Sequence, residues 1–444
     1  MTGGVHSVSV VGLGRLGSPI AACIAASGLA VVGIDKDEIK VDKLSRGEPP
    51  VVEPGLGALL GSADSISAAT GSASLASTDA TFIVVPTPSE DTGEFSLQSV
   101  LPACGEIGNI IASKADYHLV VLVSTVMPGS TGGPVMATLE EASGKRCGAE
   151  FGLCYSPSFA ALGSAIDDLL SPDFALIGES DAHAGDVLAS IYARMYDPSV
   201  RIVRTGLVNA EIAKLAVNSL LTTKITVANT LARVCERLPG ADVDEVTAAV
   251  GLDSRIGTKF LKGAISYGGP CFPRDNRAFT ALTRSIGVDA QLAEATDRDN
   301  RAGISALADV AMSRLPAGGR VGVLGLAYKP GTNVVDDAAG IMLARELDAR
   351  RSDVVVHDPL ANDEARKILP AHITVAATCQ ECVRLSDVIV IATPWSEFQQ
   401  VASEPLQAGR RRVLIDCWRM LDPARLASGA EYLRFGSGPP LPTA

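Results

Sequence analysis

Short apolar runs alternate with amphipathic stretches over roughly the first 200 residues. Six of these runs predict β-strands, at 7–11, 30–34, 80–85, 119–124, 151–154 and 174–177. Strands that alternate with helical patterns are typical of a parallel sheet with helices on its faces. We therefore expect a doubly wound, Rossmann-like α/β domain at the N-terminus.

The pattern becomes helical from 208 to 254, where Glu211, Lys214, Asn218 and Leu221 recur at three and four residues. This periodicity predicts one long helix. A second α/β pattern begins at 320–325 and continues through apolar runs at 354–356, 388–392 and 413–415. The predicted architecture is therefore two Rossmann-like parallel-sheet domains, 1–205 and 306–444, joined by a central helical segment, 206–305. The tail after Gly436 is expected to fray.

Composition narrows the functional classes. A chain of 444 residues is too long for one core, and its formal charge of −12 argues against a nucleic-acid partner. The sequence shows no basic leader and no apolar run of about 20 residues, so we expect a cytoplasmic protein without a membrane partner. We interpret the nine cysteines as scattered thiols in a reducing compartment, and expect neither a metal site nor a disulfide framework.

A glycine-rich motif follows the first predicted strand. Gly12, Gly14, Leu16 and Gly17 lie where a strand turns into a small-residue helix, and Asp35 ends the second predicted strand. In this context the glycines allow a tight turn, close approach of a pyrophosphate and close helix–strand packing. Asp35 would accept hydrogen bonds from the adenosine ribose, and its charge would repel a 2′-phosphate, which favours NAD over NADP. The motif predicts an NAD site. The alternative, that these are ordinary turn glycines, does not explain the strand, the helix and the aspartate that accompany them.

Two more loops follow predicted strands, where ligands collect in open parallel sheets. The first contains Val85, Thr87 and Pro88, and the second contains Ser124 and Thr125. Taken alone, each loop is as compatible with a plain turn as with a ligand-binding loop. Their matching positions favour the interpretation that they line the cofactor.

Residues 267–275 read Tyr-Gly-Gly-Pro-Cys-Phe-Pro-Arg-Asp. A buried cysteine is more often inert packing. Here Cys271 stands between paired glycines and the Arg274-Asp275 pair. A neighbouring cation favours the thiolate, so this context predicts a functional thiol.

The chain resembles the UDP-glucose/GDP-mannose dehydrogenase family, most closely its UDP-glucose 6-dehydrogenases. The resemblance is carried by the segments at 211–218, 253–257, 268–275, 325–330, 357–359 and 393–398, in order along nearly the whole chain. It implies that a sugar CH2OH is oxidised twice with two NAD, through a cysteine thiohemiacetal and a thioester that water hydrolyses.

The resemblance also implies roles for catalytic residues. Cys271 would be the thiol, Lys214 would stabilise an oxyanion, Asn218 would orient the sugar, and Asp275 would assist water or a base. Lys214 and Asn218 are four residues apart and would project from one helix face, for which a solvated face is the alternative.

Further contacts follow from the same resemblance. The cofactor would also meet Lys40 and Arg274. Nucleotide-sugar contacts would come from Ser158, Phe159, Lys262, Ser266, Tyr267, Gly268, Tyr328, Lys329 and Arg419. Arg255 would reach the site of a neighbouring subunit, which implies a homodimer or a higher homo-oligomer.

Five positions depart from the family pattern. Ser158 and Leu162 replace two glutamates, and Asp336 replaces an arginine. Arg274 stands for a lysine, and Ser266 for a glycine. Losing a hydrolytic carboxylate typically removes about 10²–10⁴-fold of acid–base assistance. Three outcomes therefore stay open: oxidation of a nucleotide sugar or nucleoside, a redox-neutral dehydratase or epimerase with transient oxidation, or an inactive binding protein.

Overall fold

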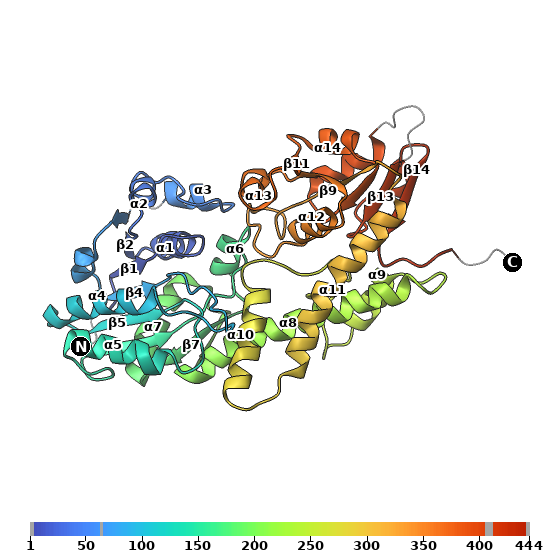
Figure 1. The fold of residues 1–444 in the computed structure, drawn as a ribbon. Helices are drawn as coiled ribbons and strands as arrows, with labels where there is room; N and C mark the ends of the chain where they lie inside the picture. Colours follow the sequence, from blue (N-terminus) through green and yellow to red (C-terminus); the bar gives the residue numbers. More distant parts are fainter. Residues whose placement is uncertain (1–3, 63–64, 405–411, 441–444) are drawn as a thin grey trace. The chain divides into compact units, whose positions relative to one another are not determined.

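The computed structural model describes residues 4–62, 65–404 and 412–440. The chain divides into two compact units, Met1–Ala216 and Val217–Ala444 (Figure 1). The boundary between them falls inside the long helix α8 (Leu207–Cys235), which confirms the long helix predicted for the central segment.

A sheet forms the centre of the first unit. Within the described residues its order is β3-β2-β1-β4-β5-β6-β7-β8. The strands are β1 (Ser7–Val11), β2 (Ala30–Ile34), β3 (Ile66–Ala69), β4 (Ala80–Ile83), β5 (His118–Leu122), β6 (Phe151–Tyr155), β7 (Phe174–Glu179) and β8 (Arg201–Gly206). All six predicted strands are present. The predicted parallel-sheet α/β fold is confirmed, and within this sheet the pair β6 and β7 is antiparallel.

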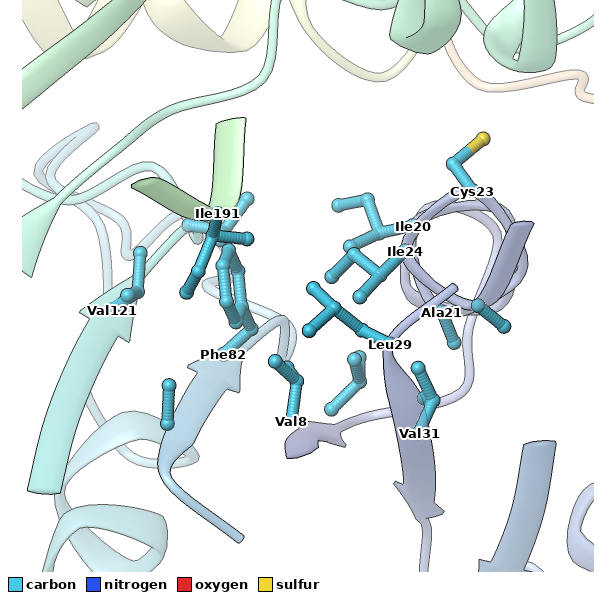
Figure 2. Close-up of a cluster of buried hydrophobic side chains, with 14 of the residues drawn as sticks. Val8, Ile20, Ala21, Cys23, Ile24, Leu29, Val31, Phe82, Val121 and Ile191 are labelled. Carbon is cyan, nitrogen blue, oxygen red and sulfur yellow. The ribbon is translucent and has the colours of Figure 1, made fainter. Parts of the chain in front are cut away.

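Helices cover both faces of this sheet. The bounds are α1 (Gly17–Ala26), α2 (Glu38–Ser45), α3 (Leu56–Gly61), α4 (Val100–Ser113), α5 (Met136–Ser143), α6 (Ala165–Leu170) and α7 (Ala182–Met195). Residues of α1, α3, α6 and α7 pack in one apolar cluster, and residues of α4 and α5 pack in another. Figure 2 shows Ile20 and Ile24 of α1 turned toward Leu29 and Phe82. Burying each such side chain contributes about 1.5–3 kcal/mol, so this packing fixes the start of α1 against the sheet.

The second unit contains a smaller parallel sheet. Within the described residues its order is β11-β10-β9-β12-β13-β14. The strands are β9 (Arg320–Leu324), β10 (Asp353–His357), β11 (Thr374–Val375), β12 (Val388–Ile391), β13 (Arg412–Asp416) and β14 (Ala430–Arg434). The four predicted strands of this region are confirmed.

The helices of the second unit are α9 (Val243–Gly251), α10 (Phe272–Ser285), α11 (Gln291–Arg314), α12 (Ala339–Ala349), α13 (Asn362–Ile368) and α14 (Cys379–Leu385), besides its part of α8. Residues of α11, α12 and α13 pack in one apolar cluster with the sheet, and α14 packs in another. Because α11 is continuous across residue 305, the boundary predicted there lies within a helix. No helix in the described part of the chain is both long and apolar enough to span a bilayer.

The first turn of the sheet is built in the same way in both units. Gly12 has φ +98° and Gly325 has φ +99°, a backbone conformation that glycine adopts without strain. A Cβ on Gly17 would lie 1.7 Å from the Gly12 carbonyl oxygen, and one on Gly340 would lie 1.9 Å from that of Gly325. Each helix after the first strand therefore packs on its turn more closely than any side chain allows.

The segment after Gly436 does not fray as far as the structure describes it. The N–H of Gly438 donates to the Ala241 carbonyl, and the N–H of Gly240 donates to the Pro439 carbonyl, both at 2.8 Å. The fraying prediction was wrong for these residues because they pair with the turn between α8 and α9. Residues 441–444 lie outside the described residues.

Candidate functional site

Asp35 organises the glycine loop of the first unit. Its Oδ2 accepts the N–H of Leu13 at 2.7 Å, and its Oδ1 accepts the N–H of Asp37 at 3.0 Å. Lys40 Nζ lies 3.6 Å from Oδ2. A Cβ on Gly14 would meet nothing within 4 Å, so the loop backbone is open to a ligand there. Gly12, Gly14, Leu16 and Gly17 thus lie beside Asp35 and Lys40, in an arrangement that fits a dinucleotide.

The two loops after β4 and β5 are joined by side-chain hydroxyls. Ser124 Oγ donates to the Val85 carbonyl at 2.7 Å, and Thr87 Oγ1 donates to the Thr125 carbonyl at 2.8 Å. β4 and β5 are paired in parallel, so their C-terminal loops emerge side by side. The structure therefore brings together the predicted cofactor-lining residues of both loops, with Pro88 next to Thr87.

Glu211 fixes the second of these loops to α8, a contact that sequence reasoning missed. The fully buried carboxylate accepts the N–H of Gly129 at 2.6 Å, the N–H of Thr131 at 2.8 Å and the Thr131 hydroxyl at 2.5 Å. Burial raises the pKa of Glu211, against the effect of these hydrogen bonds. The sequence signals were its place in the 211, 214, 218 period and in the segment 211–218 that carries the resemblance.

Lys214 lies one turn after Glu211 and is 6% exposed. Its Nζ donates to the Ser158 carbonyl at 2.8 Å and lies 4.8 Å from the centroid of the Phe159 ring. A cation over an aromatic face is stabilised by roughly 0.5–2 kcal/mol. Asn218 is likewise only 5% exposed, so the solvated helix face is the wrong alternative for this pair.

The loop that carries the substituted glutamates has its own local bonds. The Ser158 hydroxyl accepts the N–H of Ala160 at 3.1 Å. Glu53 is 8% exposed, and its two carboxylate oxygens accept the N–H groups of Gly163 and Ala165, both at 2.7 Å. The Glu53 carboxylate is therefore occupied by backbone N–H groups. Position 162 has an apolar leucine in place of a carboxylate.

In the second unit, Cys271 precedes α10 as its N-cap residue. Among the cysteines that the structure describes, it alone is exposed. One turn into the helix, Asp275 is fully buried. Its Oδ2 accepts Nδ2 of Asn218 at 2.6 Å, and its Oδ1 lies 3.3 Å from Nε of Arg274. The structure thus gathers Asn218, Asp275, Arg274 and Cys271 around one turn, and Arg274, predicted to contact the cofactor, is an ion-pair partner of Asp275.

The paired glycines before Cys271 pack on a second segment of the same unit. A Cβ on Gly268 would lie 2.2 Å from the Asp337 carbonyl oxygen, and one on Gly269, with φ +90°, would lie 2.6 Å from the Tyr328 ring. The N–H of Gly269 donates to the Asp336 carbonyl at 2.9 Å. The position where an arginine was expected therefore contacts the cysteine loop through its backbone.

The remaining predicted substrate residues differ in how far they are exposed to solvent. Lys262 is exposed, and Tyr328 and Lys329 are half-buried. The Arg255 side chain is 87% exposed and pairs with Asp253 at 2.7 Å. Tyr267 is 6% exposed. Lys262 and Arg255 are the members of this set that present a cation at the surface.

Two more of the predicted substrate residues, Arg419 and Ser266, have side chains that are hydrogen-bonded within the second unit. The side chain of Arg419 has no exposed surface, and its Nε and Nη2 donate to the Asp244 carboxylate at 2.7 and 2.8 Å. Its Nη1 donates to the Phe435 carbonyl at 3.0 Å. Ser266 is 6% exposed, and its hydroxyl donates to the Asn300 carbonyl at 2.5 Å. Both side chains are turned toward acceptors of the second unit, a half-exposed carboxylate for Arg419 and a backbone carbonyl for Ser266.

Reading the cysteines as scattered overlooked one CxxC pair, Cys379 and Cys382 in α14. The two residues are 2% and 0% exposed, and burial raises the pKa of Cys379 to about 12 and that of Cys382 beyond it. They act as apolar packing. The described residues contain no group of three or more His, Cys, Asp or Glu side chains that could hold a metal ion.

Asp358 of the second unit is the counterpart of Asp35. It is 1% exposed, and its Oδ2 accepts the N–H groups of Leu326 and Ala327 at 2.7 and 2.9 Å and Nε1 of Trp395 at 3.1 Å. Its Oδ1 accepts the N–H groups of Leu360 and Ala361, both at 2.9 Å. The carboxylate thus ties the turn after β9 to the turn after β10.

Three domain models of one family match the chain in order. They are described as the NAD-binding domain, the central domain and the UDP-binding domain of the UDP-glucose/GDP-mannose dehydrogenase family, at residues 6–196, 208–302 and 322–423. The chain belongs to this family. It is therefore an NAD-dependent oxidoreductase whose first unit contains the NAD-binding domain.

Relatives of both substrate types are similar over nearly the full length. UDP-glucose 6-dehydrogenase AglM of Haloferax volcanii is 38% identical over 93% of this chain and 97% of its own. GDP-mannose 6-dehydrogenase of Azotobacter vinelandii is 30% identical over 96% of this chain and 99% of its own. The solved structure of a UDP-glucose dehydrogenase from Pyrobaculum islandicum has a TM-score of 0.87 at 35% identity and covers 96% of this chain and 97% of its own.

Proposed function

We propose that this family member oxidises a carbinol on the sugar of a nucleotide sugar, with Cys271 as the thiol that captures the aldehyde. The observation that carries the proposal is the exposed Cys271 at the start of α10, with the buried Asn218–Asp275 pair one turn away. A uridine diphosphate sugar is favoured as substrate, because the matched C-terminal model is described as UDP-binding. Lys262, Tyr328 and Lys329 are proposed substrate contacts.

Bound NAD supplies the hydride acceptor for each oxidation. The open backbone at Gly14 and the carboxylate of Asp35 are proposed to hold its diphosphate and ribose. Lys214, whose ammonium group is held by a carbonyl and an aromatic ring, would stabilise negative charge on the sugar oxygen. Asp275 would accept the proton released as that oxygen is oxidised.

The thiol step follows from the position of Cys271. Its sulfur adds to the aldehyde carbon, the oxygen takes up a proton, and a thiohemiacetal forms. Loss of a hydride and that proton gives a thioester. Water then breaks the C–S bond, which releases a uronic acid and restores the thiol. Each uronic acid therefore accompanies two reduced cofactors.

A redox-neutral reaction is the second candidate, favoured by the loop at 158–162. The hydroxyl of Ser158 caps its own turn at Ala160, and Leu162 is apolar, so two carboxylates of the family pattern are missing. Transient oxidation would acidify a neighbouring C–H, a leaving group would depart or a centre would invert, and the hydride would return. The protein would then be a dehydratase or an epimerase that acts on the sugar of a nucleotide or nucleoside. No reduced cofactor would accumulate.

The assembly and boundaries are proposed on other grounds. We propose a homodimer or a higher homo-oligomer, supported by the 87% exposure of the Arg255 side chain. The domain limits 1–205, 206–305 and 306–444 and a cytoplasmic location also stay predictions.

The deciding experiment incubates the protein with NAD and a panel of nucleotide sugars and nucleosides, with UDP-glucose first. A product heavier than the substrate by about 14 mass units, with two reduced cofactors, supports oxidation to the acid. A product lighter by about 18, with no reduced cofactor, supports dehydration. A product of unchanged mass with one inverted centre supports epimerisation. Cys271→Ser should abolish acid formation, whereas Cys147→Ser, at a half-buried thiol, should not. An absence of product with every compound would contradict both candidates and favour an inactive binding protein.

A further inference from the structure

Two buried asparagines hold the segment that leads into the Cys271 loop. Asn229 of α8 and Asn300 of α11 are 7% and 6% exposed. Oδ1 of Asn229 accepts the N–H of Ala264 at 2.8 Å, and its Nδ2 donates to the Ile265 carbonyl at 3.1 Å. Asn300 binds Tyr267 in the same two-point way, at 2.8 Å to the N–H and 2.9 Å to the carbonyl. Each carboxamide thus takes the place that a peptide group has in a sheet.

Ser266 adds a third tie to the same helix. Its hydroxyl donates to the backbone carbonyl of Asn300 at 2.5 Å. A Cβ on Gly303, one turn along α11, would lie only 2.8 Å from the Ser266 hydroxyl oxygen. The helix therefore carries a glycine where the serine needs room.

We propose that Ser266, Asn229 and Asn300 form a clamp that fixes the position of the Cys271 loop. All three are positioning residues, because their side-chain polar atoms form hydrogen bonds to the backbone of 264–267 and of α11. A serine at this position restricts the backbone more than a glycine does and adds a hydrogen bond that glycine cannot make. The consequence for catalysis rests on the proposed function, since a small displacement of a reacting group lowers the rate of the chemical step.

The role of the clamp in loop order is measured without any substrate. Ser266→Ala and Ser266→Gly remove the hydroxyl, and Ser313→Ala removes a matched hydroxyl on α11 that donates to the Val310 carbonyl at 2.8 Å. Amide hydrogen exchange in a peptide spanning 264–269 should be about fivefold faster in both Ser266 variants. The Ser313 variant should exchange like the wild type, and the thermal unfolding temperature should identify any variant that loses the fold.

The positioning role is measured with UDP-glucose and NAD. In Ser266→Ala kcat should fall about fivefold while KM for NAD stays unchanged, because the NAD-binding domain belongs to the first unit. Wild-type exchange in Ser266→Ala overturns the clamp, and faster exchange with unchanged kcat overturns its positioning role. If the wild type accumulates no reduced NAD with the whole panel, the proposed oxidation to an acid fails, and the exchange data alone test the clamp.

Discussion

The contact between Gly17 and the turn at Gly12 gives the sharpest test of the NAD site. In Gly17→Ala the new Cβ would lie 1.7 Å from the Gly12 carbonyl oxygen and 2.9 Å from its carbon. Real Cβ atoms essentially never approach such atoms within 3.0 Å, so α1 or the turn has to move by more than about 1 Å. Overpacking of this kind costs about 1–3 kcal/mol, of which the better helix propensity of alanine offsets up to about 1 kcal/mol.

Gly17→Ala should weaken the binding of NAD as well as lower the free energy of unfolding. The displaced turn carries the backbone that is proposed to meet the diphosphate, and a loss of about 2.7 kcal/mol in binding corresponds to a hundredfold rise in Kd. We expect a rise of about this size for Gly17→Ala. Isothermal titration with NAD measures the Kd, and calorimetric unfolding of the same sample measures the stability.

Two matched alanine variants separate packing from binding. A Cβ on Gly14 has open space around it, so Gly14→Ala should unfold like the wild type and yet bind NAD about tenfold more weakly. Gly340→Ala places a Cβ 1.9 Å from the Gly325 carbonyl oxygen in the second unit, so it should lose stability and keep the wild-type Kd. Unaltered stability of Gly17→Ala, or an unaltered Kd of Gly14→Ala, would refute the reasoning.

Three further outcomes are expected. Asp35→Asn keeps an acceptor for the Leu13 N–H but removes the charge, so the preference for NAD over NADP, measured by titration, should fall about tenfold or more. Lys214→Ala should lower kcat about 10²–10³-fold with unchanged NAD affinity, and an unchanged kcat would remove Lys214 from the proposed mechanism. Burial lowers the pKa of His118 to about 3, below the value of about 6.5 expected after unfolding, so this histidine reduces stability as the pH falls from 6.5 toward 3. The slope is about 1.4 kcal/mol per pH unit at most, and urea unfolding of His118→Gln across this range should lack that contribution.

Burial on both faces explains which strands could be predicted. β4, β5 and β6 are buried at every position, and their continuous apolar runs identified them. β8 carries exposed and half-buried residues throughout, and β14 is mostly half-buried, so neither produces an apolar run. β11 has two residues, too few for any periodicity.

The site was predictable where its residues are neighbours along the chain. Gly12 to Gly17 and Gly268 to Asp275 are local motifs, and the turn chemistry of each could be read from residue order. The side chains that hold these motifs come from distant elements, such as Glu211 from α8 and Asn300 from α11. Residue order does not reveal whether a side chain such as Arg419 turns toward a ligand or toward Asp244, because that depends on tertiary packing.

The bonding of Asp358 leads to a prediction for the number of dinucleotides that one chain binds. Asp35 receives two backbone N–H groups and keeps 10% of its side-chain surface exposed, whereas Asp358, within the described residues, receives five N–H groups and is 1% exposed. A ribose diol would have to displace backbone donors to reach the second carboxylate, and each buried N–H left without a partner costs about 1–3 kcal/mol. Although the chain has two similar first turns, calorimetric titration should therefore saturate at a molar ratio of one dinucleotide per polypeptide.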